Sequence, residues 1–215
     1  MIAALCDIHG NFAALQAVLA EIPDDAVIVV GGDIAAGGPE PRATVDCLQS
    51  LGSRVQWVRG NMDRALGDSA NPSELLSDPQ AIEHAREQLT PDQATFLSEL
   101  PLTVELDGVM YCHASPRNEL DIFTERTPEE RVSFLFQELE ADVVICGHTH
   151  LQFDRVIAGR RVINAGSVGD AVESSPGAYW LLDFEPRRTN YPNAPLPTLP
   201  RDEWLDWVES LPHNL

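Results

Sequence analysis

The sequence predicts an α/β fold organised around a parallel sheet, and two observations lead to this prediction. Apolar runs of strand length alternate with segments of helical periodicity over residues 1–61. The run at residues 26–33 begins with a continuous apolar stretch, which is typical of a strand that is buried on both faces, and the segment at 142–150 indicates another such strand. Strands that alternate with helices favour βαβ units, in which the joined strands are parallel.

The first part of the chain provides three strands and two helices of this pattern. Apolar residues between Phe12 and Ile22 recur at helical spacing, and Asn11 stands where a helix N-cap belongs. In order, we expect a strand at 1–6, a helix at 12–22, a strand at 26–33, a helix at 42–51 and a strand at 55–61.

The middle of the chain changes pattern. Residues 64–103 lack strand-like runs, and the segments at 79–89 and 91–100 each open at a proline, which is favoured in the first turn of a helix. We expect a small helical hairpin here. The later expectations are a β-hairpin around Asp107 and Gly108, a helix at 128–140, a strand at 142–150, and antiparallel strands with turns at Gly159 and near Pro176 and Gly177.

The C-terminal residues differ in composition from the rest. Residues 186–200 are rich in Pro, Asn and Arg, which indicates an extended strap, and residues 202–211 are amphipathic. We therefore expect one domain at 1–185, with the hairpin at 64–103 as a cap, and a C-terminal part at 186–215 made of the strap and a short docking helix. Terminal helices usually dock on their own domain, and partner binding is the alternative.

The composition argues against several classes of function. The 34 acidic and 14 basic residues give a net charge of −20, which disfavours a broad nucleic-acid surface. No apolar run approaches the roughly 20 residues of a membrane span, and the N-terminus lacks a signal-peptide pattern. We expect a cytoplasmic protein that does not enter a membrane. The four cysteines show no metal-binding spacing and are expected to be reduced thiols.

Polar side chains stand where five of the expected strands end. In an α/β sheet, ligands bind beyond the carboxyl ends of the strands, and residues two apart can point to the same spot. Singly, each residue has a simpler explanation, because a lone His is more often a core or turn residue and Asn or Asp often serves as a cap. Their recurrence predicts a metal site made of Asp7, His9, Asp33, Asn61, His113, His148 and His150.

Five ordered sequence blocks over residues 1–183 carry a family resemblance. The blocks DIHGN, GGDIAAGGPEP, RGNMD, CHASP and GHTH resemble the signature blocks of the calcineurin-like metallophosphoesterase superfamily. The chain looks closest to the small bacterial phosphoesterases of the diadenosine tetraphosphatase-like group. This resemblance implies a four-layer α/β/β/α metallophosphoesterase sandwich, here with a small helical insertion.

The resemblance also implies two ligand sets that share a bridging carboxylate. Such proteins hold two divalent metal ions, Mn, Fe, Zn or similar, and a set of nitrogen and oxygen ligands without thiolate agrees with that range. The first set is Asp7, His9, Asp33 and His150, and the second is Asp33, Asn61, His113 and His148.

The implied reaction is hydrolysis of a small phosphodiester or an activated phosphate by metal-bound hydroxide. The expected partner is a small phosphorylated substrate, with nucleotides among the candidates, and a homo-oligomer is compatible with the sequence. Asn11 and Arg117 are candidates for phosphate contact because each lies just beyond a ligand block. A helix cap for Asn11 and a surface charge for Arg117 are the alternatives.

One block departs from the pattern of many relatives. Met62 follows Asn61, where those relatives carry a histidine that protonates the leaving group, and methionine has no proton to donate. Asp63 is therefore a candidate catalytic acid, or a residue that orients His113. The departure favours diesters or activated phosphates over monoesters. A non-catalytic scaffold and a nuclease are the alternative functions.

Overall fold

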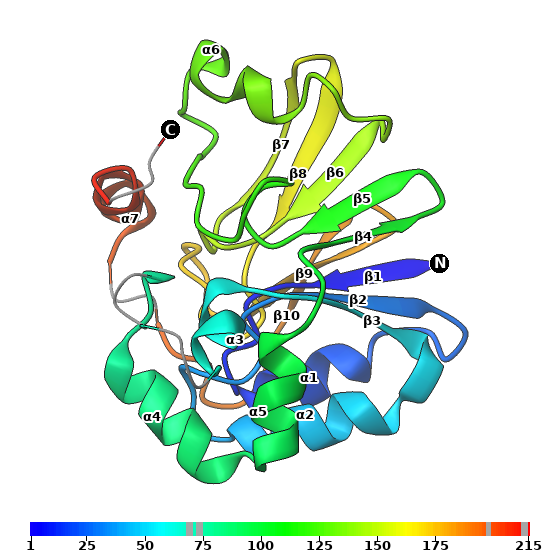
Figure 1. Cartoon of the computed structure of the whole chain (residues 1–215), viewed down its shortest axis with the longest axis vertical. Helices are drawn as coiled ribbons and strands as arrows, with labels where there is room; N and C mark the ends of the chain where they lie inside the picture. The colour runs from blue at the N-terminus through cyan, green and yellow to red at the C-terminus, as the bar shows by residue number, and fades with distance from the viewer. Residues whose placement is uncertain (68–70, 72–74, 197–198, 212–214) are drawn as a thin grey trace.

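The protein folds as two five-stranded sheets packed face to face, with helices on the outside (Figure 1). The structure, a computed structural model, describes residues 1–67, 71, 75–196, 199–211 and 215. The predicted four-layer α/β/β/α sandwich is confirmed. No helix within the described ranges has the length and apolar character needed to cross a membrane.

The first sheet has the strand order β10-β9-β1-β2-β3. Its parallel strands are β1 (Ile2–Leu5), β2 (Val27–Gly31) and β3 (Val55–Val58), and β9 (Ala178–Leu182) and β10 (Glu185–Thr189) join them as antiparallel neighbours. Its outer face is covered by α1 (Phe12–Leu19), α2 (Pro41–Ser50), α4 (Pro79–Gln88) and α5 (Pro91–Ser98) (Figure 1).

The second sheet has the strand order β4-β5-β6-β8-β7. Strands β5 (Val109–Cys112), β6 (Val143–Cys146) and β8 (Arg160–Ala165) are parallel, while β4 (Thr103–Leu106) and β7 (Gln152–Ile157) form antiparallel edges. Its outer layer is thin and consists of α6 (Glu129–Val132) and a 3-10 turn at Ser133–Leu135.

Alternating side chains of the central strands join the layers. On β1, Ala3 and Leu5 pack into the core under the helices, while Ala4 and the following Cys6 pack between the sheets. This period of two is what a strand buried on both faces requires. The four cysteines are free thiols, as expected, and Cys47 alone among them is only partly buried.

Three elements differ from the sequence expectation. The helix expected at 128–140 is only α6 and the 3-10 turn, because Val132, Leu135 and Phe136 give a buried face of little more than one turn. Residues 186–189 of the expected strap form part of β10. Finally, α4 and α5 continue the helical layer, since Ile82 and Leu97 share the core of α1 and α2.

Candidate metal centre

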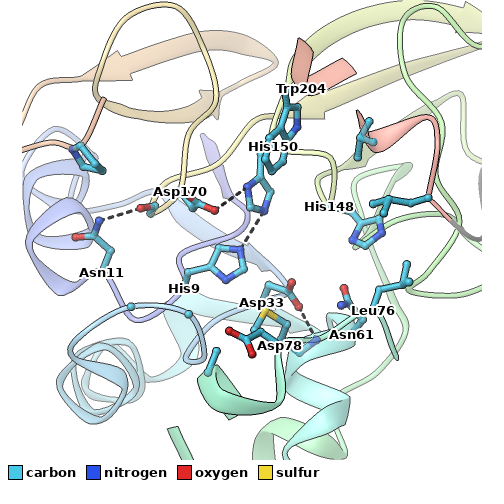
Figure 2. A pocket seen from close by; sticks show the side chains of 18 of the residues that line it. His9, Asn11, Asp33, Asn61, Leu76, Asp78, His148, His150, Asp170 and Trp204 are labelled. Atoms are coloured by element: carbon cyan, nitrogen blue, oxygen red, sulfur yellow. Dashed lines mark hydrogen bonds and ion pairs between the residues drawn. The ribbon is translucent and has the colours of Figure 1, made fainter. Parts of the chain in front are cut away.

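The seven predicted metal ligands follow the carboxyl ends of five parallel strands. Asp7 and His9 follow β1, Asp33 follows β2, and Asn61 is the first residue of α3 (Asn61–Ala65), which follows β3. From the second sheet, His113 follows β5, and His148 and His150 follow β6. The two sheets therefore deliver ligands to one place, and Figure 2 shows the labelled members pointing toward a common centre.

Five of the seven ligands have left-handed backbone conformation. Positive φ is uncommon outside glycine and costs about 1 kcal/mol or more per residue. Residues with this conformation therefore cluster at functional sites. Backbone hydrogen bonds hold the first loop in this shape, because the Asp7 N–H donates to Gly32 and the His9 N–H donates to Asp33. The φ values are 55° for Asp7, 50° for His9, 52° for Asp33, 71° for His148 and 61° for His150.

Two glycines make room for the ligand side chains. Gly32 has a φ of +91°, and a Cβ there would lie 2.6 Å from Nδ1 of His113. Gly60 needs no special dihedral, yet its Cβ would lie 2.1 Å from Oδ1 of Asp33. Any side chain at either position would therefore displace a ligand.

One half of the centre is formed by His9, His150 and Asp7. The Nε2 atoms of the two histidines face each other at 3.0 Å. Oδ1 of Asp7 lies 3.5 Å from Nε2 of His150 and 3.9 Å from Nε2 of His9. All three side chains are buried, so these ligand atoms converge on one small space away from bulk water.

The other half is formed by His113, His148, Asn61 and Asp33. Nε2 of His113 lies 3.0 Å from Oδ1 of Asn61, 3.1 Å from Nδ1 of His148 and 3.6 Å from Oδ2 of Asp33. The Asn61 amide is oriented by a bond from Nδ2 to the Leu75 carbonyl at 2.8 Å. Asp7 also lies close to this half, because its carboxylate, that of Asp33 and the His113 ring have ligand atoms within 4.8 Å of one another.

Hydrogen bonds outside the centre indicate the tautomers of His9 and His113. Nδ1 of His9 lies 2.8 Å from the Ala36 carbonyl, and Nδ1 of His113 lies 2.9 Å from the Gly31 carbonyl. Each Nδ1 must carry the proton to donate to a carbonyl, which leaves the Nε2 lone pair directed into the centre. Among the described residues, Oδ1 of Asp7 is a buried oxygen without a hydrogen-bond partner. Converging lone pairs and an unsatisfied carboxylate oxygen fit divalent cations.

Charges in the centre compensate one another through the histidines. Burial alone would raise the pKa of Asp7, but the neighbouring His150 lowers this pKa to about 2. Burial and the nearby His113 lower the pKa of His148 to about 3. Burial also disfavours the charged form of His150, yet Asp7 and Asp170 raise its pKa well above the ordinary value. Protons on histidine thus supply positive charge to the carboxylates, and divalent ions would replace those protons.

The structure places Asp63 behind the ligands. Its side chain is fully buried, and Oδ2 accepts hydrogen bonds from the N–H groups of Asp33 at 2.8 Å and Gly60 at 2.9 Å, while Oδ1 accepts from Ile34 at 3.0 Å. Burial and the nearby Asp33 raise the pKa of Asp63 to about 7. Asp63 is absent from the described lining of the cavity at the centre, and its carboxylate faces backbone.

The two predicted phosphate contacts lie in different surroundings. Asn11 lines the cavity and also caps α1, since its Oδ1 accepts from the Ala14 N–H at 3.1 Å. Arg117 is not among the described lining residues. Its Nε lies 3.0 Å from Oδ2 of Asp121, and its guanidinium lies over the Phe134 ring at 5.2 Å. The structure therefore does not bring Arg117 to the centre.

Sequence reasoning missed two residues beside the ligands. Asp170, in the loop after β8, has Oδ2 3.4 Å from Nδ1 of His150. Trp204 of α7 (Arg201–Val208) stacks on the same His150 ring, with centroids 6.0 Å apart and planes 19° apart (Figure 2). Asp170 follows Gly169 at the end of a mostly apolar run, which repeats the signal seen at the other strand ends. No local pattern around Trp204 points to the centre.

Comparisons with known proteins agree with this geometry. A protein of Methanocaldococcus jannaschii described as uncharacterized is 29% identical over 175 residues, which are 78% of this chain and 70% of that protein. A protein of Vibrio campbellii named symmetrical bis(5'-nucleosyl)-tetraphosphatase is 32% identical over 123 residues, 54% of this chain and 45% of the relative. The chain thus matches less than half of that tetraphosphatase.

Solved structures and the family comparison extend over more of the chain. The crystal structure of a metallophosphoesterase from Sphaerobacter thermophilus superposes with a TM-score of 0.73 at 25% identity, and the match covers 90% of each chain. The calcineurin-like phosphoesterase superfamily domain matches residues 1–187, which include all seven proposed ligands. The chain belongs to the calcineurin-like phosphoesterase superfamily, a family of metal-dependent phosphoesterases.

Proposed function

We propose that the protein is a dinuclear metal-dependent phosphoesterase that hydrolyses a small phosphodiester or an activated phosphate. The observation that carries the proposal is the convergence of two pairs of histidine nitrogens, 3.0 Å and 3.1 Å apart, beside Asp7 and Asp33. Two ring nitrogens that face each other at such distances cannot both be protonated, so at least one nitrogen of each facing pair carries a free lone pair. The ligands proposed are Asp7, His9, Asp33, Asn61, His113, His148 and His150.

The chain's own residues would prepare the site for hydrolysis. Two divalent ions held there would supply an activated water and a clamp on the phosphoryl oxygens. The carbonyls of Ala36 and Gly31 fix the His9 and His113 rings, so the ligand atoms need no reorganisation when the ions bind. Asp170 would hold His150 in place from the other side of its ring.

Two predicted roles take a more specific form in this proposal. Asp63 acts as a positioning residue, because its carboxylate binds the backbone of the Asp33 and Gly60 loops. Asn11 is the remaining candidate for phosphate contact, since it lines the cavity, although its Nδ2 already donates to the Gly169 carbonyl at 2.9 Å.

The side chain at position 62 supports the choice of substrate. Met62 lines the cavity beside Asn61 and offers no proton to a leaving group. A phosphodiester with a good leaving group needs little such help, whereas the alkoxide released from an ordinary monoester needs a donor. We therefore expect a preference for diesters and activated phosphates.

The experiment compares metal-free protein with protein loaded with Mn²⁺. We expect Mn²⁺-dependent hydrolysis of bis(p-nitrophenyl) phosphate, with much slower turnover of glycerol 2-phosphate, an ordinary monoester whose alkoxide leaving group needs a proton. His113→Gln should lose turnover together with bound manganese, measured by elemental analysis. The matched control is His84→Gln, which changes an exposed histidine of α4 and should alter neither. Protein that holds two metal ions and hydrolyses no phosphate ester would refute the proposal and favour the scaffold alternative.

The nuclease alternative has less support. All 14 basic residues of the chain are arginines, and none of them is among the described residues that line the cavity. A nucleic-acid backbone would need several cationic contacts beside the reacting phosphate.

A further inference from the structure

The cavity at the candidate metal centre has two chemically different walls. It encloses about 560 Å³, with the ligand side chains on one side. Another part of the lining comes from the C-terminal segment, and its residues are apolar or aromatic: Trp204, Trp207, Val208 and Leu211. Ligand pockets of this size are commonly apolar with a few polar groups, so the second wall is suited to a flat apolar group.

The indole of Trp204 is held rigidly against the ligand side. Its Nε1 donates to the Thr149 carbonyl at 3.0 Å, and its ring stacks on His150. Trp207 lies against it with ring centroids 4.7 Å apart and planes tilted by 50°. Trp207 is 44% exposed, and it lines the cavity as well. An aromatic surface that is already fixed loses little entropy when a second ring stacks on it.

Contacts with three other segments anchor α7, so this wall is a fixed part of the fold. Leu205 is fully buried against Leu151 and Val172. Arg201 reaches Glu125 at 2.8 Å, and Arg126 reaches Asp206 at 3.0 Å.

The charge of the cavity limits how many phosphates a substrate can carry. Asp78 and Asp170 line it in addition to the ligand carboxylate of Asp33, and no arginine belongs to the described lining. The chain contains no lysine, and the residues that the structure leaves undescribed include no arginine. A phosphate beyond the one at the metal ions would therefore meet carboxylates and find neither an arginine nor a lysine.

We propose that Trp204 and Trp207 form a subsite that stacks on the flat ring of a substrate with a single phosphodiester, such as a nucleoside ester, and that the cavity disfavours polyphosphate chains. This inference rests on the proposed phosphoesterase function. Its substrate class differs from the one in the name of the Vibrio campbellii relative.

The first test separates the ring from the phosphate. AMP and ribose 5-phosphate share the sugar and phosphate, and only AMP carries a base. Stacking on an aromatic side chain contributes about 1–3 kcal/mol per base, so AMP should bind Mn²⁺-loaded protein roughly 5- to 150-fold more tightly in calorimetry. Trp207→Ala should bring the AMP affinity toward that of ribose 5-phosphate. Trp207→Phe should restore most of it, because phenylalanine retains a flat ring.

A control variant and two contrary outcomes decide whether the subsite exists. Val156→Ala shortens an exposed apolar side chain outside the cavity and should leave the AMP affinity unchanged. Equal affinities of AMP and ribose 5-phosphate, with Mn²⁺-dependent diester hydrolysis intact, would overturn the subsite and leave the proposed function standing. If neither compound binds and no diester is hydrolysed, both proposals fail.

The second test addresses the charge. Asp78 caps α4 by accepting the Gln80 N–H at 2.9 Å, and asparagine is an equally good cap, so Asp78→Asn removes charge with little effect on the helix. The wild-type protein should hydrolyse diadenosine tetraphosphate with a much lower kcat/KM than a nucleoside phosphodiester. Asp78→Asn should lower the KM for the tetraphosphate roughly 3- to 10-fold, and less for the diester. A wild-type preference for the tetraphosphate would overturn the charge argument.

Discussion

Oδ2 of Asp63 lies 2.8 Å from the backbone nitrogen of Asp33 and 2.9 Å from that of Gly60. One buried carboxylate therefore ties the loop after β2 to the loop after β3, and each of these loops carries proposed metal ligands. Of the two roles that the sequence offers for Asp63, catalytic acid or orienting residue, this contact favours a positioning role.

The first prediction concerns this carboxylate. In Asp63→Asn, an amide N–H would replace one of the two acceptor oxygens and leave at least one buried backbone N–H unpaired. The free energy of unfolding should fall by about 1–3 kcal/mol, and the affinity for Mn²⁺ should fall with it. Urea denaturation and metal titration measure the two effects. Asp92→Asn, an exposed change at the start of α5, should stay within about 0.5 kcal/mol of the wild type.

The second prediction concerns the space beside Asp33. The added Cβ of Gly60→Ala would lie 2.1 Å from Oδ1 of Asp33, so the variant should lose bound manganese and diesterase activity. Gly108→Ala is the control, because its φ of +78° makes alanine strained while nothing lies within 4 Å. That control should lose about 1 kcal/mol of stability and keep its metal content. A Gly60→Ala protein with two bound ions would contradict the steric argument.

The third prediction concerns metal removal. Asp7 and Asp33 are buried beside histidines, and divalent ions that bind only the folded state should stabilise it. At a free Mn²⁺ concentration of about 100 times Kd, the gain is about 2.7 kcal/mol per site, so a chelator should lower Tm by several degrees. Differential scanning calorimetry with and without Mn²⁺ measures the change. His150→Gln should shrink the Mn²⁺-dependent rise in Tm, and an undiminished rise would argue against His150 as a ligand.

The fourth prediction concerns the missing proton donor. Met62→His places an imidazole at the edge of the cavity, directly after Asn61. Because general acid catalysis typically contributes about 10²–10⁴-fold, we expect the ratio of kcat for glycerol 2-phosphate to kcat for bis(p-nitrophenyl) phosphate to rise at least roughly tenfold. The gain should fall away as the pH rises through the pKa of the new histidine, since its acid form is then lost. Met62→Gln is the control of similar size, and an equal gain in both variants would exclude proton donation.

The ligand set was predictable from the sequence because its signal is local. Each proposed ligand ends an apolar run, as Asp33 does after β2, and parallel strands bring their carboxyl ends to one edge. Arg117 was a candidate for phosphate contact for an equally local reason, its place just beyond the His113 block. In the structure, Asp121 stands four residues later and binds its guanidinium. Trp204 could not be placed from the sequence, since it stands far from His150 along the chain and no local pattern relates the two residues.

The C-terminal wall also has a consequence for how such a protein can diversify. The family match ends at residue 187, before the first residue of α7, while every proposed ligand lies earlier in the chain. The proposed metal ligands and the proposed stacking surface are thus encoded in separate stretches of sequence. Exchange of the segment that carries α7 would replace the proposed stacking surface and leave every proposed metal ligand untouched.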